Sequence, residues 1–425
     1  MLLVAFIVFI VLMFLGVPIA FAMGLSSLFG IWLMSDIDLT LVSQKLFVSV
    51  DSFSLMAIPF FMLAGELMER GGISKRLVNF SYALVGHIKG GLGMVTILTS
   101  MIFAGVSGSA AADTAAVGNM MIPAMKKKNY PPGLAAVIQA TSGSLGPIIP
   151  PSVTMIIYAS LTGVSIGSIF LAGIIPGLII GLALMGVTYY YGHKYNLLGE
   201  QRATFRELMK ATKEAGWALF MPIIIIGGII SGVFTATESG AIAILYAFIV
   251  GLFVYKGYTL KEIPKIVLSA SAMTSMAMLI IASASILGWI TAYERFPQLA
   301  INFFTGLTEN QYIIMILIIG FLLFIGMFIE TIAATIIVAP ILMPLAAEYG
   351  FDPVHFALVM VVTLVYAGVT PPVGGILFIT MGIAQTKLKN LLKFVPSYVG
   401  IMIIVLLILA FVPQFSLFVP NHIFK

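Results

Sequence analysis

Long stretches without a charged side chain alternate with short charged segments along this chain. A helix needs about 20 apolar residues to cross the hydrocarbon core of a bilayer, so several stretches hold one span and the longest holds two. The pattern therefore predicts an all-α polytopic membrane protein. The uncharged stretches cover 1–35, 90–112, 129–193, 215–237, 239–255, 266–293, 353–386 and 394–424.

The pattern repeats after 221 residues. Pro150-Pro151 meets Pro371-Pro372 at this spacing, and Gly105, Thr114 and Pro123 meet Gly326, Thr335 and Pro344. Internal repeats with broken apolar segments at matching positions are typical of secondary transporters. We therefore expect two repeats, 1–204 and 222–425, joined by a connector at 205–221.

Each repeat is expected to contain five crossings and one hairpin-like region. Proline and glycine mark the joints, because they interrupt helical hydrogen bonding. The hairpin regions are placed at 45–89 and 266–310. The crossings are placed at 2–15, 17–34, 91–125, 134–160 and 168–192, and at 218–234, 239–255, 311–345, 355–383 and 396–419.

Five crossings per repeat is an odd number, so the second repeat is expected to be inverted in the membrane. With the amino terminus outside, the loops at 126–128, 193–213, 256–265 and 387–393 lie inside and carry most of the Lys and Arg residues. The opposite loops carry acids instead: Asp36, Asp38, Glu238, Glu348 and Asp352. The positive-inside rule favours this inverted topology. Four basic residues do not fit it: Arg70, Lys75, Arg76 and Lys89.

The segment 200–217 combines alternating charges with Phe205, Leu208, Met209 and Trp217. This is typical of an amphipathic helix on the cytoplasmic surface of the membrane. A solvated linker helix explains the pattern equally well. Either structure would connect the two repeats.

Small and polar residues interrupt the apolar segment 103–114 in the first repeat. Ser107, Gly108 and Ser109 weaken the helix, and Asp113 follows. Hydroxyl, carboxylate and freed carbonyl oxygens are ligands for Na⁺, and irregular backbone at membrane depth needs a cavity or site to line. Close packing of small residues is the alternative, but it has no use for an aspartate. We predict a sodium site here.

The matching segment of the second repeat contains Gly326, Glu330 and Thr331, with Thr335 one turn later. An ionisable residue inside a span is costly and suggests a functional site. Glu330 could instead pair with a lysine or be protonated. We predict an ion or substrate site here, with Gly326, Glu330 and Thr331 as the sodium contacts.

The two proline pairs should expose backbone carbonyls and free half-helix ends in both repeats. Carbonyls could hold a cation, and helix amino termini could hold an anion. Gly146, Pro150 and Thr370 are predicted sodium contacts, as are Ser54 and Ser275 at the hairpin tips. Ser152, Thr335 and Gly374 are weaker candidates for contact with substrate.

Composition and motifs exclude several other functions. The chain has no cysteine, and its four histidines are scattered without metal-ligand spacing. It also lacks a nucleotide-cradling GxxxxGK[ST] motif, an HExxH motif and a Ser-His-Asp arrangement. Its net charge of +5 reflects the excess of Lys and Arg that is usual in the loops of membrane proteins. An enzyme, an ATP-driven pump and a nucleic-acid-binding protein are therefore not expected.

Five motifs together resemble the large, DctM-like membrane subunit of tripartite ATP-independent periplasmic (TRAP) transporters. The resemblance spans nearly the whole chain. The motifs are LMAIPFFMLAGELM (55–68), FAGVSGSAAADTAAVG (103–118), GPIIPPSVTMIIYA (146–159), GVFTATESGA (232–241) and PPVGG (371–375).

This resemblance implies an elevator-type Na⁺ symporter for organic anions in the bacterial inner membrane, with scaffold and transport domains and two re-entrant hairpins. It implies a small four-helix membrane subunit, expected here as a separate polypeptide, and a periplasmic substrate-binding protein. Its substrates include sialic acids, other sugar acids and C4-dicarboxylates. The family's sodium sites fall on Ser107, Ser109, Asp113 and Glu330. A self-sufficient symporter of the same architecture and a non-transporting scaffold subunit are the alternatives.

Overall fold

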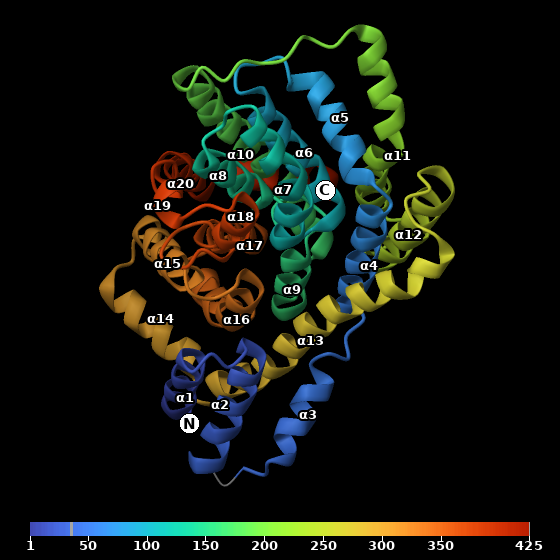
Figure 1. The fold of residues 1–425 in the computed structure, drawn as a ribbon. Coiled ribbons are helices and arrows are strands. Elements are labelled where there is room, and N and C mark those ends of the chain that lie inside the picture. Colours follow the sequence, from blue (N-terminus) through green and yellow to red (C-terminus); the bar gives the residue numbers. More distant parts are fainter. Residues whose placement is uncertain (35–36, 425) are drawn as a thin grey trace.

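The structure, a computed structural model, describes residues 1–34 and 37–424 (Figure 1). Asp36, one of the acids placed in an outside loop, lies outside this described part. The described residues form helices and contain no strand. Five helices are long and apolar enough to cross a membrane, or six if the bent pair α20–α21 counts as one span. The predicted all-α polytopic protein is confirmed to this extent.

The described residues of the first half contain ten α-helices, and a 3₁₀ turn at Ser54–Met56 precedes the fourth. They are α1 (Leu2–Phe14), α2 (Ile19–Met34), α3 (Thr40–Val48), α4 (Ala57–Arg70), α5 (Ile73–Val85), α6 (Gly91–Ser107), α7 (Ala110–Lys127), α8 (Pro132–Gly143), α9 (Val153–Thr162) and α10 (Ile166–Lys194).

The second half contains the remaining helices. They are α11 (Phe205–Ile230), α12 (Ala236–Ile249), α13 (Ile263–Tyr293), α14 (Phe296–Leu307), α15 (Gln311–Gly326), α16 (Thr331–Glu348), α17 (Pro353–Ala367), α18 (Gly375–Ala384), α19 (Leu388–Leu391), α20 (Val395–Phe411) and α21 (Gln414–Ile423). A π-helical turn, Val250–Val254, extends α12.

Helix bounds in the two halves recur at the spacing seen in the sequence. Shifting α7 by 221 residues gives the bounds of α16 residue for residue, and α8 and α17 begin at matching prolines. The Pro150-Pro151 and Pro371-Pro372 bonds are both cis. The sequence repeat thus extends to the helices, while the inverted orientation of the halves and the domain boundaries stay predictions.

The segment 91–125, expected to be one broken span, is a helical hairpin. Thr96, near the start of α6, contacts Met125, near the end of α7, with 3.9 Å between the hydroxyl oxygen and the sulfur. Only Gly108 and Ser109 separate the two helices, so the chain reverses within two residues. Gly108 has φ +62°, and a Cβ there would lie 2.5 Å from the Pro151 carbonyl oxygen. The turn therefore requires glycine.

The segment 311–345 is a second hairpin, made of α15 and α16. Its outer ends meet where the Tyr349 hydroxyl donates to the Thr308 carbonyl oxygen at 2.8 Å. The placement of single crossings at 91–125 and 311–345 was therefore wrong. Apolar content alone does not reveal whether the chain continues or reverses at a break.

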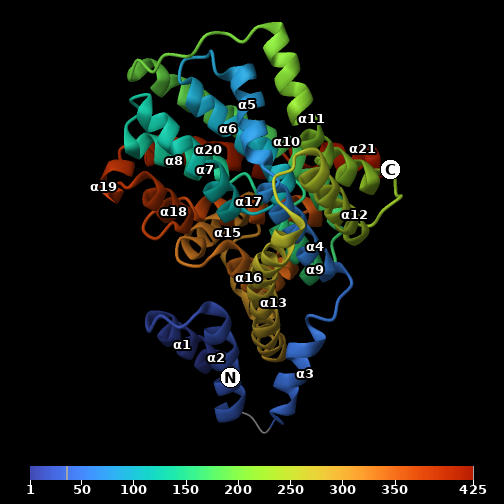
Figure 2. The same ribbon diagram turned by 45° about the vertical axis from the view of Figure 1, so that its right-hand side comes forward.

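The hairpins predicted at 45–89 and 266–310 are absent from these segments. Residues 263–293 form the continuous helix α13, which has no glycine or proline between residues 265 and 287 to reverse the chain. In the first half, α5 continues from α4 toward the far end of the molecule in both views (Figures 1 and 2). Ser54 and Ser275 therefore do not lie at hairpin tips.

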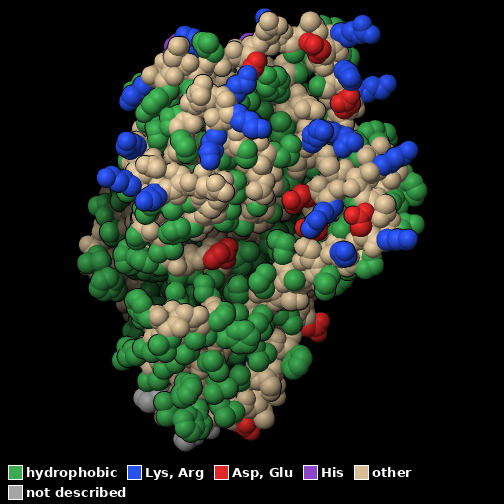
Figure 3. Space-filling view, viewed as in Figure 1, with side chains coloured by type: hydrophobic (Ala, Val, Ile, Leu, Met, Phe, Trp, Pro, Cys, Tyr) green, Lys and Arg blue, Asp and Glu red, His purple; other side chains and the backbone are tan. Residues whose placement is uncertain are grey.

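Relocating the hairpins changes the expected position of Lys89, one of the four basic residues that did not fit. The number of crossings in each half stays a prediction. Lys89, before α6, and Lys126, in the last turn of α7, thus lie at the same end of the first hairpin. Lys and Arg side chains gather on the upper part of the visible face, while the lower part is mainly hydrophobic (Figure 3).

The connector at 205–221 is not a separate element. Helix α11 runs from Phe205 to Ile230 without a break, so the amphipathic segment and the following span form one helix. Thr204 caps its amino terminus in a reciprocal arrangement with Glu207, in which each side chain bonds the other residue's backbone N–H.

Two short helices form the centre of the molecule. From Gly133 to Gly143 every residue of α8 is buried, as is every residue of α17 from His355 to Ala367. Helix α8 packs against α6, α7 and α18, and α17 packs against α15, α16 and α20. Each central helix ends at a proline-containing break, and this places both breaks in the interior beside the hairpin tips.

Candidate functional site

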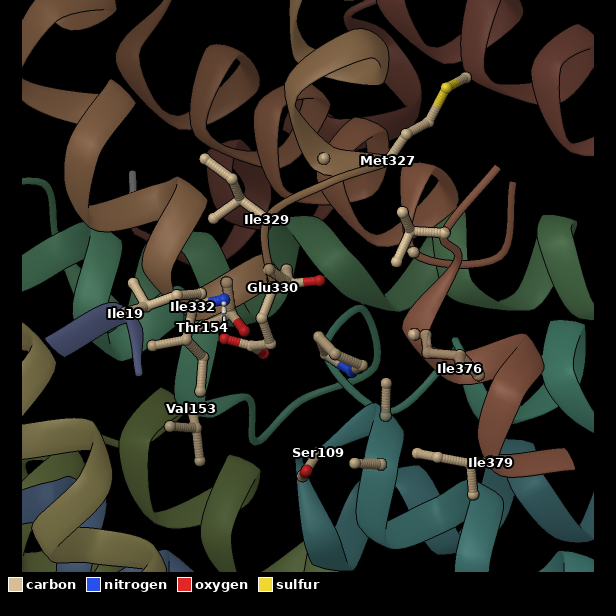
Figure 4. Close-up of a pocket in the computed structure, with 18 of the residues that line it drawn as sticks. Ile19, Ser109, Val153, Thr154, Met327, Ile329, Glu330, Ile332, Ile376 and Ile379 are labelled. Atoms are coloured by element: carbon tan, nitrogen blue, oxygen red, sulfur yellow. Dashed lines mark hydrogen bonds between the residues drawn. The ribbon is translucent and has the colours of Figure 1, made fainter. Parts of the chain in front are cut away.

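All four chain breaks meet at one cavity of about 360 Å³ (Figure 4). The breaks are the two hairpin tips, 108–109 and 327–330, and the interruptions 144–152 and 368–374. Residues of every break and of the helices that adjoin the breaks line the cavity, together with Ile19 of α2 and Met62 of α4. The expected convergence of the breaks is therefore present.

The first hairpin tip encloses a buried carboxylate. Ser109 caps α7 by accepting a hydrogen bond from the Ala112 backbone N–H. Asp113, in the first turn of α7, is completely buried and accepts a hydrogen bond from the Ser107 hydroxyl through Oδ1. Its other oxygen, Oδ2, has no hydrogen-bond partner among the described residues. A buried acceptor without a partner is costly and is available to a ligand.

Gly146 brings the interruption after α8 against this tip. A Cβ at this position would lie 2.7 Å from Oδ2 of Asp113 and 2.9 Å from the Ser109 carbonyl oxygen. The Val153 backbone N–H also donates to the Gly108 carbonyl oxygen at 3.4 Å. The structure thus brings together Ser109, Asp113 and Gly146, as the predicted first site requires.

The second hairpin tip presents a carboxylate to the cavity. Glu330 precedes α16, and its Oε2 accepts hydrogen bonds from the Ile332 and Ala333 backbone N–H groups at 2.9 and 3.3 Å. Glu330 and Ser109 approach the cavity from opposite sides (Figure 4). Thr331 also lines the cavity, and the end of α15 at Gly326 packs closely on Ala367.

The two halves differ in how well their breaks are enclosed. Ser109 and Glu330 are equivalent at the spacing of 221, but Asp113 corresponds to Ala334. The first interruption is buried almost throughout, including Pro150 and Pro151, whereas Pro372 and Val373 of the second are exposed. The first site is therefore enclosed by protein and the second is open.

Four other predicted residues take part in local structure. The Thr370 hydroxyl donates to the Tyr366 carbonyl oxygen, and the Thr335 hydroxyl donates to that of Thr331. Ser152 is buried, donates to the Pro147 carbonyl oxygen at 2.6 Å and caps α9. Gly374, with φ +48°, precedes α18. These contacts position the breaks, and a role of the four residues in binding stays a prediction.

Two predicted residues lie away from the cavity. Ser54 lines a separate cavity near the start of α10 and α12, and Ser275 is exposed in the middle of α13. Both were chosen because hairpin tips were expected at these positions. The structure does not bring them to the site.

Sequence reasoning missed three polar residues around the site. Thr154 lines the cavity from the first turn of α9. Thr114 and Gln139 are completely buried between α7 and α8, and Thr114 Oγ1 and Gln139 Oε1 have no partner among the described residues. Gln139 also donates to the Asp113 carbonyl oxygen. Gln139 could have been identified from the sequence, because it is a glutamine inside the uncharged stretch 129–193.

Helix ends of both polarities face the cavity. The amino termini of α7, α9, α16 and α18 carry partial positive charge, and the carboxyl termini of α6, α8, α15 and α17 carry partial negative charge. The described lining residues include no Lys, Arg or His. The cavity can therefore offer backbone N–H groups to an anion and oxygen atoms to a cation, but no cationic side chain.

Comparison with known proteins identifies the family. A family model described as the DctM component of tripartite ATP-independent periplasmic transporters matches residues 6–415. The chain belongs to this family. The resemblance expected from the five motifs is thus confirmed, and the cavity lies in a member of a transporter family, consistent with the chain not being an enzyme.

Relatives of this DctM-family chain include three large permease proteins. The C4-dicarboxylate protein DctM of Pseudomonas aeruginosa is 39% identical, covering 94% of each chain. The 2,3-diketo-L-gulonate protein YiaN of Escherichia coli is 38% identical, also covering 94% of each. The sialic acid protein SiaM of Vibrio cholerae is 37% identical, covering 96% of each.

The fold of this DctM-family chain also resembles a solved transporter structure. The YdaH transporter of Alcanivorax borkumensis matches with a TM-score of 0.62, covering 91% of this chain and 90% of that one. At 14% sequence identity this similarity concerns the fold alone.

Proposed function

We propose that this chain is the large permease subunit of a Na⁺-coupled transporter that imports a small organic anion. A periplasmic substrate-binding protein delivers the anion, and a small membrane subunit completes the transporter. A bacterial inner membrane is the setting that this assembly requires. Family membership supports the transporter class, and the cavity supports the coupling to a cation.

The proposal rests on the negative charge of the cavity. Glu330 opens into it, Asp113 is buried beside it, and the described lining contains no cationic side chain. An organic anion entering this space would be repelled by both carboxylates in a medium of low dielectric constant. Bound cations remove this repulsion. Binding of anion and cation is therefore expected to be mutually dependent, which is the basis of symport.

Sodium suits the oxygen atoms available at the two tips. At the first tip we assign Na⁺ to Asp113, Ser107 and the backbone around Ser109 and Gly146. At the second tip we assign it to Glu330, Thr331 and the carbonyl-bearing helix end at Gly326. Both sets contain only oxygen donors, which bind hard cations, and both lie at broken helices.

The helix amino termini offer a place for the substrate carboxylate. Those of α7 and α9 approach the cavity beside Ser109 and Thr154. Backbone N–H groups at such ends bind anions through the helix dipole and through unsatisfied hydrogen-bond donors. Substrate bound there would share the cavity with Glu330 and its cation.

The repeat suggests how the site crosses the membrane. We propose that the halves are inverted repeats and that the hairpins move together with the broken helices α8–α9 and α17–α18. Helices α1, α2 and α11–α13, which expose many large apolar side chains, would form the fixed scaffold. This elevator movement would carry cations and substrate together.

The named relatives narrow the substrate to a class. Their printed substrates, C4-dicarboxylate, 2,3-diketo-L-gulonate and sialic acid, are all organic acids. We propose a substrate of this class, a sugar acid such as sialic acid or a C4-dicarboxylate. A self-sufficient Na⁺ symporter for the same anions is the alternative, and the partner requirement distinguishes the two.

The test is uptake by proteoliposomes that contain the chain with its membrane partner. A panel of organic acids is offered with and without the binding protein, an inward Na⁺ gradient and ATP. We expect uptake of one acid only when Na⁺ and the binding protein are both present, with no effect of ATP. Equal uptake without a Na⁺ gradient would contradict the coupling. Full activity without the binding protein would favour the self-sufficient symporter.

A further inference from the structure

A second, larger cavity of about 550 Å³ lies between α14 and the second hairpin. Every residue that lines it is apolar. They come from α1, α14, α15 and α16: Phe6, Phe296, Leu299, Ala300, Phe303, Phe304, Ile318, Phe321, Ile325, Ile337, Val338, Ile341 and Leu342. We call this space the α14 crevice. It has the size of a site for a small ligand but lacks polar groups to orient one.

One face of α14 forms a wall of the crevice. Phe296, Leu299, Ala300, Phe303 and Phe304 recur at helical spacing on this face, yet no residue of α14 is buried. Leu299 and Phe303 remain 61% and 63% exposed. In water such a face would be costly at about 25 cal/mol for each Å² of apolar surface. The crevice therefore suits an apolar occupant.

A cationic residue stands at the amino-terminal end of α14, next to Phe296 of the crevice wall. Arg295 immediately precedes Phe296, is exposed and has no ion pair within the described chain. The neighbouring acid, Glu294, is already paired with the amino group of Met1 at 2.6 Å. The positive end of the α14 dipole adds to the charge of Arg295. This end of the crevice is therefore complementary to an anion.

Aromatic side chains place the same end near the membrane surface. Trp289 and Tyr293 stack with ring centroids 5.0 Å apart in the last two turns of α13, just before Arg295. Such residues gather at the level of the lipid head groups. An occupant of the crevice would thus have an anionic group at the interface and an apolar group deeper in the membrane.

We propose that the α14 crevice is a phospholipid site. The phosphate binds Arg295 and the amino terminus of α14, and one acyl chain lies along Leu299, Ala300 and Phe303. On the topology proposed above, the lipid comes from the outer leaflet of the bilayer. The site needs only the membrane setting and does not depend on the identity of the transported anion.

Lipid retention measured by native mass spectrometry tests this proposal. The purified chain is mixed with phosphatidylethanolamine, phosphatidylglycerol or diacylglycerol carrying the same acyl chains. We expect one molecule of either phospholipid to be retained, and diacylglycerol about fivefold less. Arg295→Gln should lower phospholipid retention about fivefold, the effect of one basic contact at a membrane surface. Lys265→Gln, which removes an exposed charge from α13, should have no effect.

A second variant tests the acyl-chain part of the site. Ala300→Phe fills the crevice and should abolish retention of all three lipids, while Ala272→Phe on the exposed face of α13 should not. Thermal unfolding confirms that both variants are folded. Equal retention of diacylglycerol, loss of retention in Lys265→Gln, or unchanged retention in Ala300→Phe would overturn the proposal. Displacement of the lipid by the small membrane subunit would show that protein, not lipid, covers the crevice.

Discussion

Replacing Gly146 by alanine adds one methyl group at the first hairpin tip. Gly146 has a φ that other residues adopt readily, so the substitution adds volume without backbone strain. The new Cβ would lie 2.7 Å from Oδ2 of Asp113 and 2.8 Å from the Ser109 carbonyl carbon. Ordinary contacts begin near 3.4 Å, so the tip and the interruption must separate by about 0.6–0.7 Å.

This displacement falls on the oxygens assigned to the first sodium. Overpacking a closely packed interior costs about 1–3 kcal/mol. If overpacking destabilises only the Na⁺-bound conformation of the tip, Na⁺ affinity falls by about 5- to 150-fold, since about 1.4 kcal/mol corresponds to a factor of ten. The affinity for substrate at saturating Na⁺ should change little, because the methyl group points toward Asp113.

The assay is Na⁺-driven uptake by proteoliposomes, with the Na⁺ concentration for half-maximal uptake as the readout. Gly320→Ala is the matched control. It lies in the middle of α15, an arm of the second hairpin, and its added Cβ would meet nothing within 4 Å. This control should leave Na⁺ dependence unchanged and increase stability by up to about 1 kcal/mol through helix propensity.

Two results would refute the reasoning. One is a folded Gly146→Ala protein whose half-maximal Na⁺ concentration stays within twofold of the Gly320→Ala control. The other is an increase in the half-maximal substrate concentration that persists at saturating Na⁺, with Na⁺ dependence unchanged. The first result would show that sodium does not bind at this tip. The second would show that the tip binds the substrate anion instead.

Three further predictions concern the carboxylates and the hairpin. Asp113→Asn should abolish uptake and remove the first site's share of the thermal stabilisation by Na⁺, about 2.7 kcal/mol for one site when Na⁺ exceeds its Kd a hundredfold; stabilisation equal to wild type would contradict this. Glu330→Gln should lose transport but keep part of the α16 cap, whereas Glu330→Ala should lose about 1 kcal/mol of stability as well, measured by thermal unfolding. Thr96→Cys with Met125→Cys should form a disulfide in this otherwise cysteine-free chain, detected by mass spectrometry after protease cleavage, and failure under oxidising conditions would argue against the hairpin.

Much of the fold follows from the sequence because glycine and proline act locally. The spacing of 221 identified the breaks at the Pro-Pro pairs and at the segments around Ser109 and Glu330. It also matched α7 to α16. These features depend on which residues cannot continue a helix, and that information lies in neighbouring residues.

The direction of the chain after each break could not be read in the same way. A hairpin with two apolar arms has the same hydropathy as a broken span, so α6–α7 was taken for a crossing. Loop charge held the missing signal. Lys89 and Lys126 flank the first hairpin with the same sign, and Glu309 and Glu348 flank the second. Like charges at both ends indicate that a segment returns to the side from which it entered.

The contacts that complete the site were beyond sequence reasoning because they join distant segments. Asp113 was recognised because close packing of small residues has no use for an aspartate. Its approach to Gly146 depends on how α7 packs against α8, however, and no pattern within either segment specifies that distance. The contacts of Gln139 could not be predicted from the sequence either, because they also join α8 to α7.

The first interruption is enclosed by protein and the second is open, and this difference affects how fast each sodium ion is released. An ion beside Asp113 is surrounded by buried residues, so it can leave only when the protein around it opens, and such movements take microseconds to milliseconds. An ion beside Glu330 faces the open cavity next to the exposed Val373, so it can exchange by diffusion. In this conformation ²²Na⁺ release should therefore show a fast and a slow phase of equal amplitude, and the slow ion is the last to leave.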